Sequence, residues 1–368
     1  MSPVITEDAR AIVEHLTPSL RPLAGSTVLV TGATGMVGQY VTRALLEIGR
    51  RVDGGLQVIA LARNADKVRR SFADLADSAA LQVVIGDVAE PQLPGPVTHI
   101  VHAASPARPD AFRTDPVGVI RANVLGAFAL LELARRDGAY FNFISTMEVY
   151  GAIPREPGQD VVLGESDAGV LDSLDLRSAY PESKRLAENL CIAYEAQHGV
   201  RSDIVRLTHT YGPGMDPEDT RVQAEFLNKA LSGQDIVLKS DGSLSRTYTY
   251  IADAASAVLY VLLTAGGRAR PEAFNVADEA GRTTIRELAE TVLAAAGREA
   301  DALRFDLAET PERLWSKTGG GVYVDCSRAR ALGWSARYPL AEGIARTVRH
   351  HRESGSFGPQ AQQESRGS

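Results

Sequence analysis

The 368-residue chain contains few cysteines and no long apolar run. Cys191 and Cys326 are too few for a disulfide framework in a chain of this length, so we expect two free thiols in a reducing compartment. The longest apolar runs, such as AVLYVLL at 257–263, are far shorter than the roughly 18 residues of a membrane span. The expectation is a cytoplasmic protein with no membrane partner.

Positive charge is also scarce. Asp and Glu total 46 against 39 Lys and Arg, which gives a formal net charge of −7. A nucleic-acid-binding face needs a concentration of basic residues, so no nucleic-acid partner is expected. A small phosphate-bearing ligand remains compatible with this charge because local groups hold it. The first residues are acidic at positions where a signal peptide would be basic and then apolar.

The middle of the chain alternates between short apolar runs and amphipathic stretches. Runs rich in Val, Ile, Leu and Phe predict strands that are buried on both faces, and helices between them predict a parallel sheet. The fold class is therefore α/β, a Rossmann doubly wound parallel sheet with a smaller C-terminal substrate-binding lobe. The expected strands are 26–32, 56–63, 81–87, 98–105, 141–151 and 202–207, and the expected long helices are 36–49, 119–136 and 180–197.

The ends of the chain differ from this pattern. A segment with helical spacing is broken by Pro18 and Pro22, and the last residues are polar and rich in Gly, Ser and Gln, which predicts disorder. The expected organisation is an N-terminal helical extension at 1–24, a Rossmann domain at 25–205 with a return segment near 246–276, the smaller lobe mainly at 206–350, and a disordered tail at 351–368.

A glycine-rich turn connects the first strand to the first long helix. Its glycines allow a sharp turn, close approach of the backbone to a pyrophosphate, and tight packing of helix on strand. The N-terminus of the helix then offers free N–H groups and a partial positive charge to the anion. The predicted cofactor contacts in this turn are Gly32, Thr34, Gly35, Met36, Val37 and Gly38.

The ends of the second and third strands leave the type of dinucleotide open. Arg63 stands where an acidic residue would accept the ribose 2′-OH of NAD, and it could equally pair a 2′-phosphate, stack on adenine or be a surface residue. Asp87 and Val88 follow the third strand, where Asp87 could accept from the adenine amine or stabilise a turn. We expect NAD, with NADP not excluded, and no metal.

Tyr180 and Lys184 are four residues apart at the start of a predicted helix, and therefore lie on one face of it. A phenol with an ordinary pKa near 10 is a poor base at neutral pH. A neighbouring ammonium favours the phenolate, so Tyr180 could accept the proton of a sugar hydroxyl while a hydride leaves for the cofactor. Lys184 would also bind the nicotinamide ribose.

Two further polar residues follow the fifth strand. Thr146 could share the substrate proton with Tyr180, although alone it is an ordinary strand residue. Glu148 could act near C5 of a sugar, as a base or as the partner of a substrate carboxylic acid, and a solvated loop glutamate is the simpler alternative. These four residues are the candidate catalytic set.

The chain resembles the extended short-chain dehydrogenases/reductases, the group of nucleotide-sugar epimerases, dehydratases and decarboxylases. The resemblance covers roughly residues 25–350 and implies a bound nicotinamide cofactor and a nucleoside-diphosphate sugar. It places Thr146, Tyr180 and Lys184 in the family's catalytic roles, and Asn123, Ala103, Ala104 and Ser105 at the cofactor. It rests on GATGMVG, GDV, HAAS, RANVLGAFALLE, STMEVYG, YPESK, RLTHTYGPGM, SRTYTYIADAASA and DCSRARALGW in this order.

Within this group the chain is most similar to UDP-glucuronate decarboxylases (UDP-xylose synthases). It shares HAASPARP and Thr-x-Glu with them, and it has Thr-Arg-Val at 220–222 where they have Gly-Arg-Val. The resemblance puts Pro106 and Arg108 at the substrate. Dehydratases carry an acid at the position of Met147, and a thioether cannot donate a proton. The expected activity is thus decarboxylation of UDP-glucuronate after oxidation at C4. The alternatives are, in order, a nucleotide-sugar 4-epimerase and a 4,6-dehydratase. A non-catalytic cofactor-sensing protein is the alternative of a different class.

Two departures from the decarboxylase pattern affect substrate binding. The basic Arg-x-Pro-Asp of that group is replaced by residues 322–325, Val-Tyr-Val-Asp, so one candidate carboxylate partner is missing. His209 replaces an asparagine, and it could donate to the substrate or be a packed histidine. Arg221 and Arg246 are the best diphosphate ligands, since a guanidinium matches two phosphate oxygens. The resemblance also implies a homodimer through helices 119–136 and 180–197.

Overall fold

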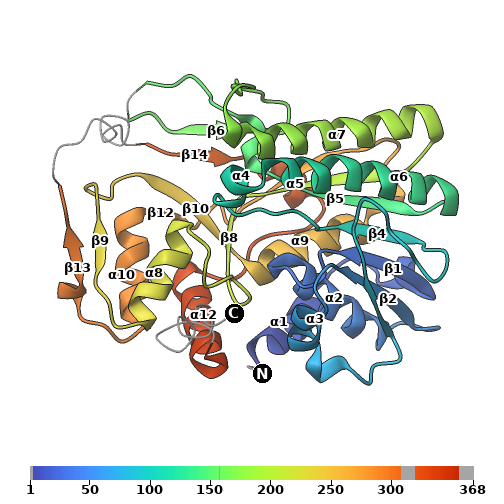
Figure 1. Cartoon of the computed structure of the whole chain (residues 1–368), viewed down its shortest axis with the longest axis horizontal. Helices are drawn as coiled ribbons and strands as arrows, with labels where there is room; N and C mark the ends of the chain where they lie inside the picture. The colour runs from blue at the N-terminus through green and yellow to red at the C-terminus, as the bar shows by residue number, and fades with distance from the viewer. Residues whose placement is uncertain (1–2, 157, 308–319, 356–368) are drawn as a thin grey trace.

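The fold is built around a seven-stranded parallel sheet, seen in a computed structural model that describes residues 3–156, 158–307 and 320–355. The strand order is β11-β7-β5-β4-β1-β2-β3, and every neighbouring pair is parallel (Figure 1). This arrangement confirms the predicted doubly wound fold. The strands are β1 (Ser26–Thr31), β2 (Leu56–Ala62), β3 (Leu81–Ile85), β4 (His99–His102), β5 (Tyr140–Thr146), β7 (Ser202–Leu207) and β11 (Ala273–Val276).

The strand order reverses beside β1. The chain passes from β1 to β2 and β3 on one side, and later strands are added on the other side, beginning with β4. Thr31, at the end of β1, is paired with Leu61 of β2 and His102 of β4. Loops that leave neighbouring strands in opposite directions open a crevice at their carboxyl ends, where ligands bind in such sheets. The candidate site is expected there.

Helices cover both faces of the sheet (Figure 1). Side chains of α1, α2 and α9 form one core with the sheet, and side chains of α6 and α7 form a second core on the other face. Strand β5 is buried at all its positions, as its apolar sequence predicts. The bounds are α1 (Val4–His15), α2 (Met36–Gly49), α6 (Gly126–Asp137), α7 (Ala179–His198) and α9 (Ile251–Leu263).

Several strand ends differ from the prediction by one to three residues, and two predicted elements differ more. The strand expected at 141–151 stops at Thr146, because the Thr146 hydroxyl accepts the N–H of Glu148 and starts a 3-10 turn at Met147–Tyr150. The helix expected at 119–136 is divided into α5 (Pro116–Ile120), a π-helical turn at Arg121–Leu125, and α6. Apolar periodicity does not detect either change.

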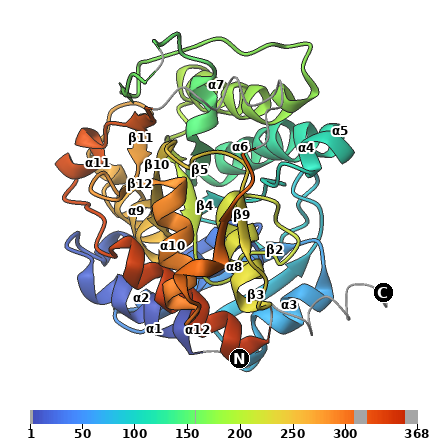
Figure 2. The same cartoon turned by 90° about the vertical axis from the view of Figure 1, so that its left-hand side faces the viewer.

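A second lobe packs beside the sheet (Figures 1 and 2). It contains a three-stranded sheet in the order β12-β10-β8 and the pairs β13-β9 and β14-β6, together with several helices. Its bounds are β8 (His209–Tyr211), β9 (Ile236–Leu238), β10 (Ser245–Tyr250), β12 (Arg282–Thr284), β13 (Leu303–Phe305), β6 (Val161–Leu163), β14 (Val322–Val324), α8 (Val222–Leu231), α10 (Ile285–Ala295), α11 (Ser327–Ala331) and α12 (Leu340–Ser354).

The expected start of the disordered tail at 351 is wrong. Helix α12 continues to Ser354, because its inner face still packs against the protein at this point and His351 is only 1% exposed. The remainder of the predicted tail, 356–368, lies outside the described residues.

The N-terminal helix is fixed by a buried carboxylate. Asp8 is fully buried and accepts hydrogen bonds from the hydroxyls of Tyr40 (2.7 Å) and Tyr250 (2.6 Å) and from Nε of Arg346 (2.8 Å). These partners belong to α2, β10 and α12. Burial raises the pKa of Asp8, and the hydrogen bonds and the arginine charge oppose that rise. Asp8 therefore ties the N-terminal extension to both parts of the fold.

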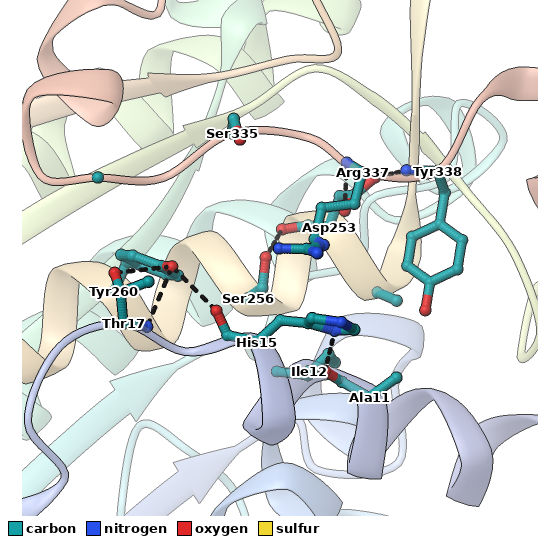
Figure 3. A pocket seen from close by; sticks show the side chains of 12 residues that line it. Ala11, Ile12, His15, Thr17, Asp253, Ser256, Tyr260, Ser335, Arg337 and Tyr338 are labelled. Atoms are coloured by element: carbon teal, nitrogen blue, oxygen red, sulfur yellow. Dashed lines mark hydrogen bonds between the residues drawn. The ribbon is translucent and has the colours of Figure 1, made fainter.

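A pocket lies where α1 meets α9 and the segment 333–338 (Figure 3). Asp253 of α9 accepts the backbone N–H groups of Arg337 (3.0 Å) and Tyr338 (3.1 Å), and Tyr260 donates to the carbonyl of His15 (3.2 Å). None of the predicted site residues lines this pocket. Its polar groups thus anchor loops around the extension.

We predict that Asp8→Ala lowers the free energy of unfolding by about 2–4 kcal/mol, because it leaves two buried hydroxyls without their acceptor and removes the nearer carboxylate partner of the half-buried Arg346. Urea unfolding followed by circular dichroism measures the change. Glu7→Ala is the control, since Glu7 makes only half-exposed ion pairs with Arg346 and Arg349, each worth about 0–1 kcal/mol. Equal effects of the two substitutions would contradict the role of Asp8.

Candidate active site

The backbone is packed so closely in the turn between β1 and α2 that two of its glycines have no room for a side chain. Gly32 has a φ of +62°, and a Cβ there would lie 2.7 Å from the backbone of Ala104. A Cβ at Gly38 would collide with the carbonyl oxygen of Gly32. Gly35 is the N-cap of α2 and has no side chain to cap it, so the first N–H groups of the helix face a bare turn. This is the geometry that a pyrophosphate requires.

The surroundings of the turn also fit a dinucleotide. Ala103, Ala104 and Ser105 follow β4 directly beside it, and Thr34 is 9% exposed. Among the described residues, the hydroxyl of Ser105 and Oδ1 of Asn123 are buried without a hydrogen-bond partner. Buried polar atoms are normally paired, so these two are suited to a bound ligand. Met36 and Val37 form the first turn of α2.

The residues after β2 and β3 are placed as expected but are not equally available. Arg63 is exposed at the end of β2. Asp87 accepts the N–H of Ala89 (2.8 Å) and lies 3.8 Å from Arg121, so it stabilises the turn in which it stands. Val88 is buried in the core between the sheet and α6. The structure therefore supports the turn role of Asp87, and Arg63 remains open to a ligand.

Lys184 is buried between β5 and α7. Its Nζ donates to the carbonyl oxygen of Ile144 (2.7 Å), and the side chain is 2% exposed. The ammonium lies 4.6 Å from the ring centroid of Phe143 and 6.0 Å from that of Tyr180. Burial lowers the pKa of Lys184 to about 7, and the charge of Glu188 partly opposes this shift. Lys184 thus exchanges its proton near neutral pH.

Tyr180 stands at the first turn of α7 and is 7% exposed. Its ring stacks on Phe112, with centroids 4.6 Å apart and an interplanar angle of 11°. Burial raises the pKa of Tyr180 well above its usual value, the negative charge of Glu148 raises it further, and a hydrogen bond with Thr146 opposes the rise. Without added positive charge the phenol is neutral. A cation bound beside it is required to make it a base.

Glu148 faces the same space from the 3-10 turn after β5. Burial raises the pKa of its carboxyl group, and three arginines lower it, in the order Arg177, Arg246 and Arg221. A raised pKa favours the protonated form of the carboxyl group, and shifts of this kind are common at catalytic sites. Glu148 is therefore a partly desolvated acid surrounded by cations, unlike a solvated loop residue.

The predicted phosphate-binding arginines are held by local partners. Arg221 makes a bidentate pair with Asp219, whose side chain is 2% exposed. Arg246 lies 3.0 Å from Nε2 of His209 through Nη1. Burial and the charge of Arg246 lower the pKa of His209 to about 3, so His209 is neutral and its Nε2 accepts from Arg246. His209 is thus a packed, neutral histidine that orients Arg246.

Pro106 and Arg108 lie on the loop after β4, and their side chains differ in availability. Pro106 is half-buried. The guanidinium of Arg108 lies 3.2 Å from Asp110, 3.1 Å from Asp216 and 3.7 Å from Glu218. Arg108 therefore joins the β4 loop to the loop after β8.

Sequence reasoning missed the residues that hold α7 in place. Arg185 donates to the carbonyls of Val149 (2.6 Å) and Gly169 (2.9 Å). Glu188 accepts from Ser145 (2.5 Å) and makes a bidentate pair with Arg206 of β7. No sequence signal marks these residues, because their partners are 16 to 43 positions away along the chain.

Comparison with known proteins identifies the class of this site. Residues 28–277 match the model of the NAD dependent epimerase/dehydratase family, and the chain belongs to that family. UDP-glucuronic acid decarboxylase 3 from Arabidopsis thaliana is 30% identical to it over 336 residues, which cover 89% of this chain and 91% of the relative. The family indicated by the motifs is thereby confirmed.

Solved structures agree with this assignment. A dTDP-glucose 4,6-dehydratase from Streptomyces venezuelae, with NAD and TYD bound, superposes with a TM-score of 0.72 at 27% sequence identity. The superposition covers 90% of this chain and 98% of the dehydratase chain. UDP-glucuronic acid 4-epimerase from Bacillus cereus, in complex with UDP-glucuronic acid and NAD, has a TM-score of 0.73 at 20% identity over 89% and 99% of the two chains, and shares the fold.

The buried Lys184 predicts a pH-dependent stability for the cofactor-free protein. Because the pKa is lower in the folded than in the unfolded chain, the unfolded state binds more protons above about pH 7, and stability rises with pH there. Lys184→Met should remove a rise of up to about 2 kcal/mol between roughly pH 7 and 9. Urea unfolding of both proteins across this range measures it, and parallel curves would contradict the shift.

Proposed function

We propose that this protein oxidises C4 of a nucleoside-diphosphate sugar with bound NAD, and that its substrate is UDP-glucuronate, which it decarboxylates. The observation that carries the proposal is the convergence of Thr146, Tyr180 and Lys184 at the same edge of the sheet as a turn shaped for a pyrophosphate. The similarity to UDP-glucuronic acid decarboxylases over most of the chain supports the choice of substrate.

The side chains would divide the reaction between them. Tyr180 accepts the proton of the C4 hydroxyl, with Thr146 as its hydrogen-bond partner. A bound nicotinamide would supply the acceptor for the hydride from C4. Lys184 supplies the positive charge that favours the phenolate.

The resulting 4-ketone makes the sugar a β-keto acid. The bond between C5 and C6 breaks, carbon dioxide leaves, and the electron pair passes through C5 to the C4 oxygen as an enolate. Glu148 would then return a proton to C5, since burial raises the pKa of its carboxyl group and favours the protonated form. The product is a UDP-4-keto-pentose, or UDP-xylose if the hydride returns.

Dehydration is disfavoured by Met147. Its thioether packs against the apolar cluster that includes Tyr150, Leu163 and Val324, so no acid stands where a leaving hydroxyl would be protonated. A 4-epimerase is the second candidate. It is favoured by the absence of the basic residue expected near 322–325, where Val322–Val324 forms strand β14 instead.

Product masses distinguish these reactions. The NAD-loaded protein is incubated with UDP-glucuronate, UDP-glucose and dTDP-glucose. We expect loss of carbon dioxide from UDP-glucuronate; an isomer would indicate the epimerase, and loss of water the dehydratase. Tyr180→Phe should reduce turnover at least about 100-fold while cofactor stays bound, since a positioned acid–base group contributes about this much. If the mass of none of the three sugar nucleotides changes and no isomer forms, the proposal of an enzyme is contradicted and a cofactor-sensing protein is favoured.

We further propose a cytoplasmic homodimer, formed through α5, α6 and α7, which lie side by side (Figure 1). Large apolar side chains are exposed on their outer faces: Val117, Ile120, Leu125, Phe128, Leu186 and Ile192. Among the described residues, Pro116–Asp137 is the one helix long and apolar enough to cross a membrane by length and composition, and 44% of its apolar window is buried. A second copy would cover the exposed part.

Phe128→Asp should shift the dimer towards monomer, because a carboxylate would be desolvated in the interface. Sedimentation velocity measures the state at several concentrations. The control is Val237→Asp, which places the same charge at an exposed apolar residue of the other lobe. A wild-type monomer, or a Phe128→Asp protein that remains a dimer, would contradict this interface.

A further inference from the structure

Arg177 stands close to the catalytic set although the site motifs do not include it. It lies in the 3-10 turn Leu176–Ser178, three residues before Tyr180, and this turn packs against both α4 (Ala111–Thr114) and α7. Asp175 accepts the N–H of Arg177 (3.0 Å) and fixes the backbone of the turn. The position of Arg177 is therefore set by the same helix start that positions the phenol.

The guanidinium of Arg177 is available, whereas the other cations of the site are occupied. Arg221 is paired with Asp219, Arg246 with His209, and Arg108 with three carboxylates. Arg177 is exposed, and within the described part of the chain its guanidinium has no hydrogen bond or ion pair. It can thus accept an incoming anion without breaking an existing pair.

The charges around Glu148 favour a sugar carboxylate as the anion that Arg177 would bind. Of the three arginines that act on the Glu148 carboxylate, Arg177 has the largest effect. The carboxyl carbon of a hexuronate is bonded to C5, next to the C4 on which Tyr180 would act. It would therefore enter the space beside Glu148, where two carboxylates repel each other unless a cation lies between them.

The rest of the fold supplies no substitute at the expected place. The basic residue anticipated near 322–325 is replaced by Val322–Val324, and Tyr323 in that strand is buried. An arginine matches a carboxylate with two parallel hydrogen bonds, so one free guanidinium is sufficient.

We propose that Arg177 binds the carboxylate of the sugar and makes this site selective for hexuronates over neutral hexoses. The inference rests on the proposed function, because it names a determinant of the substrate that the same site would accept. Arg177 neutralises the substrate carboxylate in the ground state and keeps it beside Glu148.

Equilibrium binding tests the inference without turnover. The NAD-loaded Tyr180→Phe protein is titrated calorimetrically with UDP-glucuronate and UDP-glucose, with and without Arg177→Ala. We expect Arg177→Ala to weaken the binding of UDP-glucuronate roughly 10- to 100-fold, as for the loss of a hydrogen bond to a charged group. The binding of UDP-glucose should weaken by less than about threefold. Arg177→Lys should recover part of the loss, since it keeps the charge and loses the bidentate geometry.

Arg113→Ala is the matched control, because Arg113 is an exposed arginine on the neighbouring helix α4 and should change neither affinity. The inference would be overturned if Arg177→Ala weakened the binding of both sugars equally. It would also be overturned if the protein with Arg177 intact showed no higher affinity for UDP-glucuronate than for UDP-glucose. Failure of the proposed function is a separate result: the wild-type protein would bind UDP-glucuronate selectively through Arg177 and release no carbon dioxide.

Discussion

A single buried ammonium connects the sheet to the chemistry of this protein. Lys184 donates to the carbonyl of Ile144 at the end of β5 and lies over the rings of Phe143 and Tyr180, so one side chain joins strand, helix and phenol. A desolvated ammonium is costly, and its lowered pKa of about 7 records that cost. The cost is tolerated where the charge has a function, and here it faces a phenol that is too weak a base alone.

The residues around Lys184 keep that geometry. Ser183 donates to the carbonyl of Tyr180 and accepts from Asn123, and the bidentate pair of Glu188 with Arg206 fixes the next turn of α7 to the sheet. The π-helical turn that carries Asn123 is of the kind often found at functional sites. Arg177, Arg221 and Arg246 act together on the Glu148 carboxylate, which suits a ligand carrying phosphates and a carboxylate.

The sequence predicted the elements well where one local pattern determines them. Helix α2 occupies 36–49 as expected, since its start follows the glycine turn and its apolar face is regular. The prediction failed at Thr146, where one side-chain hydrogen bond ends the strand, and at α12, where burial of His351 extends the helix. Both depend on contacts that periodicity does not contain.

Motifs and spacing also brought together the candidate site residues that follow strand ends, because parallel strands present their carboxyl ends at one edge. Two residues could not be predicted in this way: Asp8, with partners on three distant elements, and Arg177, whose guanidinium has no hydrogen bond or ion pair with the residues that the structure describes. Their significance comes from positions that only the folded chain defines: one is deep in the core, and the other lies beside a carboxylate that is distant in sequence.

The most direct test of the central claim is to follow hydrogen from C4 of the substrate. The NAD-loaded enzyme is mixed with UDP-glucuronate that carries deuterium at C4 and is quenched within one turnover. If Tyr180 and Lys184 promote oxidation at C4, deuterium is found on the nicotinamide before carbon dioxide is released or at the same time. With Tyr180→Phe the deuterium should stay at C4 and no carbon dioxide should be released. Release of carbon dioxide while the deuterium never leaves C4 would contradict the account.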